Sequence, residues 1–345
     1  MTRTTARPLL HRVMNSAADN LVPFQATIEV TSRCNLSCKH CYIDVRAEHE
    51  LSLAEFKGVL DQLAESGTMY LLFTGGEPFT RPDFLDIAFY AREKGFMIMF
   101  LTNGTLITPA IGRDIMRLEP IFVGMSLHGA TPDTHDGITG KQGSFTSMMQ
   151  SIELLQELGI RVSLQTLLMD TNVHEAAAIK GLARSLGAYH VVSYQFVPTR
   201  RGSLSPFNYE ADPGTLFSYF DSEPLAEDPP GPVKGEVCKA GRGICAISAA
   251  GDVSPCLMMP MKVGNIREAA FTDIWIHHPS PELTRLRSLT WDDLTECRNC
   301  HLARYCQKCM GVAYSETGSL TKPAPSACRN AAIKAEFFRR KGVIA

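Results

Sequence analysis

The chain has 345 residues, of which 45% are hydrophobic, and a formal net charge of −2 at pH 7. This length suits one large domain or a barrel with a smaller module, and the near-neutral charge gives no strong field for nucleic acid or an anionic membrane surface. No apolar run reaches the roughly 18–20 residues of a membrane helix. Residues 1–20 also lack the apolar core and cleavage site of a secretory signal. The sequence therefore predicts a cytoplasmic protein whose partners are neither nucleic acid nor membrane.

Strand and helix patterns alternate from residue 26 onward. Six apolar segments predict strands, at 26–31, 69–74, 97–104, 121–127, 161–169 and 190–197. Helical spacing follows each of them, at 51–67, 81–95, 108–118, 144–159, 174–187 and 213–223. Ser52 is expected to cap the first helix together with Glu55, and Gly67 to close it. This alternation predicts a parallel sheet with helices outside, as a partial barrel or a doubly wound sheet.

The unusual loops all follow predicted strands. A cysteine triplet follows the first strand, GGEP (75–78) the second, NG (103–104) the third and HGA (128–130) the fourth. In barrels, the chemistry lies in the loops after the carboxyl ends of the strands. These loops are therefore expected to form the functional site.

Cysteine is the unusual component, with 11 residues, an odd number that cannot all pair in disulfides within the chain. Cys34, Cys38 and Cys41 form a C-x3-C-x2-C motif, and the other eight cysteines lie between Cys238 and Cys328. A thiolate metal site usually has four ligands, so the triplet lacks one. Taken alone, the triplet also fits a zinc site with a distant fourth ligand.

The triplet after a first strand, followed by GGEP after a second, resembles the radical S-adenosylmethionine (SAM) superfamily, over residues 24–200. The resemblance implies an α/β fold, a partial (β/α)6 TIM-like barrel at 24–202 after an N-terminal extension at 1–23. It implies that the three cysteines bind three irons of a [4Fe–4S] cluster, whose fourth iron is chelated by SAM. An electron from the cluster then yields a 5′-deoxyadenosyl radical, while the protein supplies ligation, orientation and exclusion of water.

The same resemblance implies a set of SAM contacts. His40 takes the position whose backbone meets the adenine, Gly75 and Gly76 let the backbone approach the ligand, and Glu77 can accept from the SAM ammonium. The remaining implied contacts, at the ends of strands three to six, are Asn103, Ser126, Gln165 and Val197. The chain departs from the pattern at His128, where many relatives carry Asp, and in ITGK (138–141), where an Arg is frequent.

The cysteine-rich C-terminal part, 238–345, follows a linker at 203–237 that includes the Pro-rich stretch 222–236. A hairpin is expected at 245–256, turning near Gly251, and a closing helix at 325–342. This part resembles the SPASM module, a small α+β domain that carries two auxiliary [4Fe–4S] clusters. With the SAM cluster, the resemblance implies three clusters in all.

The SPASM pattern implies how the eight later cysteines divide. The first auxiliary cluster takes Cys238, Cys245, Cys256 and Cys309, and the second takes Cys297, Cys300, Cys306 and Cys328. One departure is the gap between Cys306 and Cys309, which holds two residues where three are usual. The alternative is a pair of zinc ribbons, because C-x2-C at 297–300 is also a zinc-knuckle spacing.

SPASM enzymes of this layout most often modify peptides or proteins, so the resemblance implies a peptide-modifying enzyme that makes a crosslink or thioether, epimerises a residue or oxidises a side chain. A separate leader-binding protein and a flavodoxin or ferredoxin-type electron donor are the implied partners. The second reading is a radical SAM enzyme for a small molecule such as a tetrapyrrole. The third is a metal-binding protein without catalytic activity.

Overall fold

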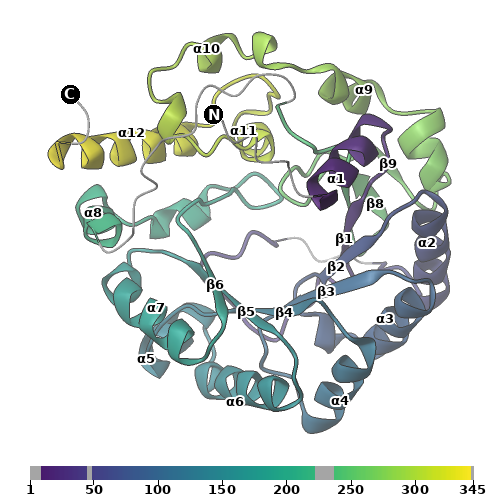
Figure 1. The fold of residues 1–345 in the computed structure, drawn as a ribbon, viewed down its shortest axis with the longest axis horizontal. Coiled ribbons are helices and arrows are strands. Elements are labelled where there is room, and N and C mark those ends of the chain that lie inside the picture. The colour runs from purple at the N-terminus through teal and green to yellow at the C-terminus, as the bar shows by residue number, and fades with distance from the viewer. Residues whose placement is uncertain (1–8, 45–48, 222–236, 343–345) are drawn as a thin grey trace, which may run out of the picture.

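The computed structural model describes residues 9–44, 49–221 and 237–342 (Figure 1). Six parallel strands form where the apolar segments predict them: β1 Gln25–Glu29, β2 Tyr70–Thr74, β3 Met97–Thr102, β4 Phe122–Ser126, β5 Val162–Leu167 and β6 Tyr189–Ser193. Each strand pairs with the next along the chain. The prediction of an alternating parallel sheet is confirmed, although β6 ends at Ser193 instead of reaching residue 197.

The predicted helices are present and cover the outer face of this sheet (Figure 1). They are α2 Leu53–Glu65, α3 Phe84–Glu93, α4 Pro109–Leu118, α6 Ser144–Glu157, α7 Ala176–Ser185 and α8 Pro213–Asp221. Ser52 and Glu55 form the expected capping box at the start of α2, and Gly67 follows its end with a φ of 83°. Two helices within residues 9–221 were not predicted: α1 Leu9–Asp19 and α5 Pro132–Thr139.

The six strands curve into a partial barrel that stays open between β6 and β1 (Figure 1). The sheet does not end at β1, because β7 Ile244–Ile247 pairs parallel to it, with Ala26 opposite Cys245. The strands β8 Asp252–Ser254 and β9 Gly264–Asn265 then continue the sheet in antiparallel fashion. The hairpin predicted at 245–256 is thus confirmed, but its membership in the barrel sheet was not foreseen.

The C-terminal part is otherwise made of short helices: α9 Pro281–Ser288, α10 Thr295–Arg298, α11 Met310–Thr317 and α12 Pro325–Arg340. The closing helix α12 lies beside α8 on the β6 side of the barrel (Figure 1), and Phe337 stacks on Phe217 there. The C-terminal part therefore touches both edges of the open barrel, through β7 at one edge and α12 at the other. None of the described helices is long and apolar enough to cross a membrane.

The segments on the two sides of each predicted boundary pack against one another. One hydrophobic core joins Phe73 and Phe100 of the barrel to Met259 and Trp275 of the C-terminal part. The helix α1, in the predicted extension, precedes Leu21, whose carbonyl oxygen accepts a 2.9 Å hydrogen bond from the Trp275 indole. In the predicted linker, 213–221 form α8, and the Pro-rich stretch 222–236 lies outside the described residues.

Candidate active site

The cysteine triplet lies in an irregular loop directly after β1. Its thiols are close enough to act on one another: burial, together with the neighbouring thiols of Cys41 and Cys34, raises the pKa of Cys38 to about 12. The unpredicted helix α5 supports this loop from below, because the amides of Ser37 and Lys39 each donate a 3.0 Å hydrogen bond to its last carbonyls. The fold thus gathers the three thiols that the sequence predicts as one ligand set.

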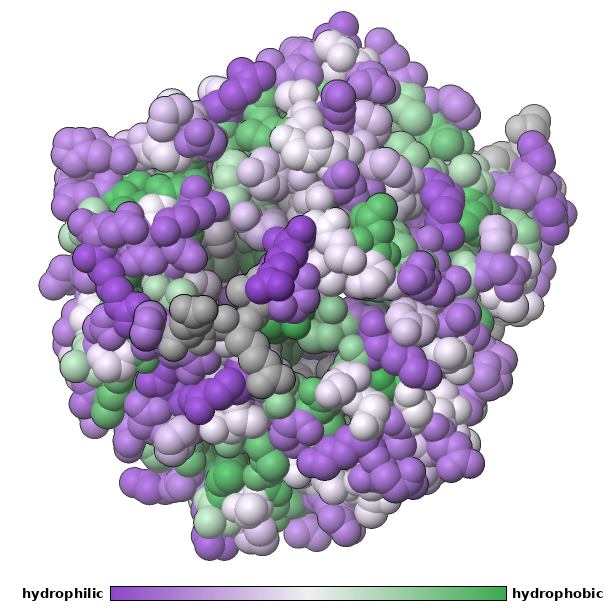
Figure 2. Space-filling model, turned by 180° about the vertical axis from the view of Figure 1, so that it is seen from behind, coloured by the Kyte–Doolittle hydropathy of each residue, from purple (hydrophilic) through white to green (hydrophobic). Residues whose placement is uncertain are grey.

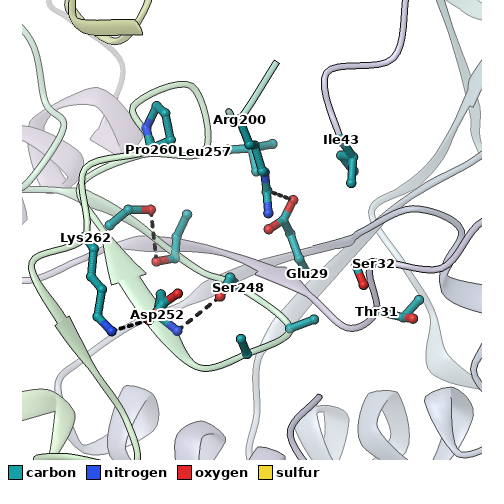
Figure 3. A pocket seen from close by; sticks show the side chains of 14 residues that line it. Glu29, Thr31, Ser32, Ile43, Arg200, Ser248, Asp252, Leu257, Pro260 and Lys262 are labelled. Carbon is teal, nitrogen blue, oxygen red and sulfur yellow. Dashed lines mark hydrogen bonds and ion pairs between the residues drawn. The ribbon is translucent and has the colours of Figure 1, made fainter. Parts of the chain in front are cut away.

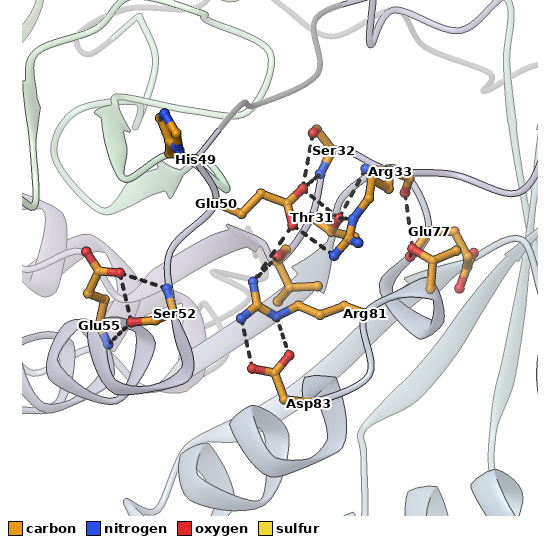
Figure 4. Close-up of polar contacts among 12 residues, drawn as sticks. Thr31, Ser32, Arg33, His49, Glu50, Ser52, Glu55, Glu77, Arg81 and Asp83 are labelled. Carbon is orange, nitrogen blue, oxygen red and sulfur yellow. Dashed lines mark hydrogen bonds and ion pairs between the residues drawn. The ribbon is translucent and has the colours of Figure 1, made fainter.

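A buried polar network fixes the entry to this loop (Figure 4). One carboxylate oxygen of Glu50 accepts from the Thr31 hydroxyl at 2.7 Å and from the Ser32 amide at 2.9 Å. Arg81, whose side chain is only 6% exposed, donates to the Val30 carbonyl at 3.0 Å and forms two hydrogen bonds with Asp83. Because a buried charge is costly unless it is paired, these residues hold the strand end rigidly. No sequence motif singled out Glu50 or Arg81.

A cavity of about 650 Å³ opens beside the triplet, at the carboxyl ends of the strands. It is lined by all three cysteines and by six of the eight residues predicted to contact SAM, namely His40, Gly75, Gly76, Asn103, Ser126 and Gln165. These residues come from five different loops or strands and meet only in the folded chain. Seen from behind, the molecule is hollowed near its centre (Figure 2), with hydrophobic residues in the hollow and hydrophilic ones around it.

The two glycines allow a close approach between loops. A Cβ on Gly75 would lie 2.3 Å from the Thr31 carbonyl oxygen, and one on Gly76 would lie 2.2 Å from that of Arg33. Gly75 also has a φ of 146°, which L side chains rarely adopt. In the structure the glycines therefore let the loop after β2 pack against the backbone that leads into Cys34.

This packing gives a first prediction. Gly76→Ala should push the cysteine loop away, because the atoms in the way belong to the backbone and cannot swing aside. We expect a loss of about 2–4 kcal/mol in the free energy of unfolding and weaker iron binding at the triplet. Denaturant unfolding and iron analysis measure both. Gly58→Ala is the matched control, because a Cβ there meets nothing within 4 Å. Equal stability and iron content in Gly76→Ala and wild type would contradict this reading.

Glu77 and Val197 do not line this cavity. The Glu77 side chain is fully buried and accepts hydrogen bonds from the Thr102 hydroxyl and the Asn103 amide, both at 2.7 Å. Burial raises its pKa to about 7. Val197 lies beyond the end of β6 and packs against the C-terminal part, beside Val312 and Ala327. Contact of these two residues with SAM stays a prediction that this geometry does not favour.

Three histidines form a neutral polar wall of the cavity. The His40 and His128 rings lie 4.6 Å apart, and the Nδ1 of His135 accepts a 3.2 Å hydrogen bond from the His128 amide. Burial lowers the pKa of His40 to about 4 and that of His128 well below its usual value. The buried Nδ1 atoms of His40 and His128 have no partner within the described chain. Both atoms can bond a ligand, and both rings are uncharged.

The eight C-terminal thiols fall into two groups in space. Burial raises the pKa of Cys256 to about 11, and the thiols acting on it are those of Cys238 and Cys309. Cys256 in turn acts on the buried Cys245. Burial also raises the pKa of Cys306 to about 11, where the thiols acting on it are those of the second predicted set, Cys328, Cys297 and Cys300. The interleaved division predicted from the sequence is therefore compatible with the fold.

Within residues 9–44, 49–221 and 237–342, no three or more His, Cys, Asp or Glu side chains are grouped closely enough to hold a single metal ion.

The C-terminal part also forms a wall of the cavity. Leu257 and Met258, which directly follow Cys256, line it together with the barrel residues. A smaller cavity of about 250 Å³ adjoins it and shares Ser32, Ile43 and Leu257. There, Arg200 from beyond β6 forms an ion pair with Glu29 of β1 (Figure 3), which links the two edges of the open barrel.

Comparison with known proteins identifies the family. Residues 28–181 match the radical SAM superfamily, and residues 238–301 match the SPASM iron–sulfur cluster-binding domain. The AdoMet-dependent heme synthase of Methanosarcina barkeri is 30% identical over 334 residues, covering 86% of this chain and 94% of that protein. The chain therefore belongs to the radical SAM superfamily, and it is an enzyme that carries a SPASM domain.

Other relatives are named for a different activity. The subtilosin biosynthesis protein AlbA of Bacillus subtilis is 28% identical, over 87% of this chain and 70% of that protein. Among solved structures, SuiB of Streptococcus suis bound to precursor peptide SuiA has a TM-score of 0.65 at 16% identity, covering 92% of this chain and 79% of that one. Native anSMEcpe with bound AdoMet and a peptide has a TM-score of 0.67 at 15% identity, over 93% of this chain and 98% of that one. These two structures confirm the fold.

Family membership implies SAM and three [4Fe–4S] clusters as the cofactors. The anaerobically reconstituted protein should accordingly hold about twelve irons. Metal analysis together with Mössbauer spectroscopy measures their number and type. Stoichiometric zinc with only about four irons would show that the C-terminal cysteines bind zinc, and the assignment of two auxiliary clusters would be wrong.

Proposed function

We propose that Cys34, Cys38 and Cys41 ligate the SAM-binding cluster and that SAM occupies the adjoining 650 Å³ cavity. We further propose that Cys238, Cys245, Cys256 and Cys309 hold one auxiliary cluster, and that Cys297, Cys300, Cys306 and Cys328 hold the other. The observation that carries this proposal is the convergence of the triplet, the two glycines and three further strand-end residues on one cavity.

The chain's own residues would orient the reaction. When bound, the cluster and SAM supply a 5′-deoxyadenosyl radical that takes a hydrogen atom from the substrate. Gly75 and Gly76 keep the loop after β2 close to the cysteine loop, and Asn103 ties Asn35 to this site with a 2.8 Å hydrogen bond. The free Nδ1 atoms of His40 and His128 can bond polar atoms of SAM without adding charge. Leu257 and Met258 exclude water on the substrate side.

For the substrate we propose a peptide or protein side chain, presented by a separate leader-binding protein where the substrate has a leader. The sheet supports this, since its strands run from β6 to β9 without closing around the cavity. Met258 supports it too, because an unbranched thioether adapts to varied side chains. Relatives named as a subtilosin biosynthesis protein and a mycofactocin maturase agree with it. A flavodoxin or ferredoxin-type carrier would supply the electron.

A specific observation also favours the small-molecule reading. The heme synthase of Methanosarcina barkeri matches this chain over 94% of its own length, whereas AlbA matches over 70%. The second candidate is therefore a radical SAM reaction on a tetrapyrrole.

One assay separates the two candidates. The reduced enzyme is mixed with SAM and, in parallel, with iron-coproporphyrin III or with short peptides encoded beside its gene. The release of 5′-deoxyadenosine above the substrate-free level, and the mass of the product, are measured. Stimulation and mass change with a peptide alone support the first candidate. The same result with the porphyrin alone would replace it with the second.

A further inference from the structure

The two-residue link between Cys306 and Cys309 contains a lysine that faces a cysteine set. Cys306 directly follows a short helical turn and Cys309 directly precedes α11, so Gln307 and Lys308 alone connect residues assigned to different auxiliary clusters. The Nζ of Lys308 lies 3.3 Å from the Sγ of Cys297 and donates a hydrogen bond to it. The unusually short gap therefore places a cation at the second set of thiols.

The surroundings of Lys308 leave its charge available to this set of thiols. Within the part of the chain that the structure describes, no carboxylate forms an ion pair with Lys308. The carboxylate of Glu316, on α11, is engaged by Ser326, whose amide donates to it at 3.0 Å. The ammonium group is thus directed at the sulfurs.

A cation in this position has a definite effect on an iron–sulfur cluster. One-electron reduction adds negative charge to a cluster that four thiolates already make negative. Hydrogen bonds to the sulfurs and nearby positive charge stabilise the reduced form more than the oxidised form, so they raise the reduction potential. A neutral side chain at the same place would give a lower potential.

We propose that Lys308, through its hydrogen bond to the Cys297 sulfur, raises the reduction potential of the auxiliary cluster held by Cys297, Cys300, Cys306 and Cys328. This inference rests on the ligand assignment made under the proposed function. Lys308 is a positioning residue here, because it acts through the cluster and does not touch the substrate.

The location of the two cysteine sets indicates in which direction an electron would move between their clusters. Cys256 of the first set adjoins Leu257 and Met258, which line the SAM cavity, whereas Cys328 of the second set is exposed. A substrate radical that loses one electron would reduce the first cluster, which would reduce the second. An oxidised flavodoxin or ferredoxin-type carrier would then take the electron from the exposed side. Raising the potential of the outer cluster draws the electron outward.

The test is a potentiometric titration of the complete, reconstituted enzyme, followed by electron paramagnetic resonance. Lys308→Met removes the charge and the donor while keeping the chain length. We expect the midpoint potential of one of the three clusters to fall by about 59 mV or more. This shift is a tenfold change in the equilibrium constant of a one-electron reduction. The other two midpoints should stay in place. Lys308→Arg keeps the charge and the hydrogen-bond donor, so its midpoint potential should stay close to the wild-type value.

Lys322→Met is the control for removing a lysine, because Lys322 is an exposed residue of the same part of the chain. Three unchanged midpoints in Lys308→Met, with all irons retained, would overturn the proposal and leave the ligand assignment intact. Loss of about four irons from Lys308→Met would overturn it in favour of a role in assembly. The assignment itself is tested separately by Cys297→Ala: if that variant keeps three clusters, the assignment fails.

Discussion

Replacing Cys34, Cys38 and Cys41 together by Ala should abolish the reductive cleavage of SAM while leaving about eight of about twelve irons in place. The three thiols act on one another and line the same cavity, so no other described cysteine is placed to substitute for them. The eight C-terminal thiols group apart from them and should still assemble. The production of 5′-deoxyadenosine and the iron content measure the two halves of this prediction.

The matched control is Cys328→Ala, which removes an exposed thiol of the second C-terminal cysteine set. It should lose auxiliary iron and still cleave SAM. If the triple variant continued to make 5′-deoxyadenosine, the radical would not arise at the triplet. If it lost all iron, the triplet would be needed for folding as well, and its loss of activity would carry no information about chemistry.

The barrel could be predicted because its signals are local. Each of the six strands is a short apolar run, and the helix after it has a cap or a closing glycine, as at Ser52 and Gly67. The helix α5 was missed although its signals were present: Thr131 caps it, Pro132 begins it and Gly140 ends it in the left-handed conformation. These eight residues include only one large apolar side chain, Ile138, so no helical spacing of apolar residues marks them.

The joining of the two parts could not be predicted, because it depends on contacts far apart in the sequence. The alternation at 245–256 predicts a hairpin, but nothing in it specifies β1 as its neighbour. An open sheet edge offers backbone groups to any strand that reaches it. The ion pair of Arg200 with Glu29 and the network around Glu50 and Arg81 likewise join segments without a shared motif.

The sequence motifs predict which residues meet at one edge of the sheet, but not which of their side chains face the cavity. His40, the glycines, Asn103, Ser126 and Gln165 sit at strand ends, and a parallel sheet brings all such ends to one edge. Glu77 sits there as well, but its carboxylate is taken up by Thr102 and Asn103. Val197 was placed by assuming that the sixth strand runs four residues longer than it does.

The other large effect is expected in the C-terminal part. Cys245→Ala should remove about four irons and stop substrate conversion. SAM cleavage should continue in this variant, although no product forms. Cys245 is buried in β7, opposite Ala26 of β1, and Cys256, proposed to bind the same cluster, directly precedes Leu257 and Met258 of the cavity wall. A cluster in that place can bind the substrate or take its electron, whereas the triplet can still reduce SAM. The measurement compares 5′-deoxyadenosine with modified product in the same reaction.

Loss of the cluster must be separated from damage to the hairpin, because metal ligands also stabilise a fold. Val253→Ala is the matched control: Val253 is fully buried in β8, next to β7, and holds no metal. It should cost about 1–3 kcal/mol in the free energy of unfolding, yet keep its irons and its coupling of SAM cleavage to product. If Cys245→Ala, folded and lacking four irons, still converted substrate at the normal rate, this cluster would be structural only. If Val253→Ala also uncoupled the reaction, the shape of the cavity wall, and not the cluster, would be what the substrate requires.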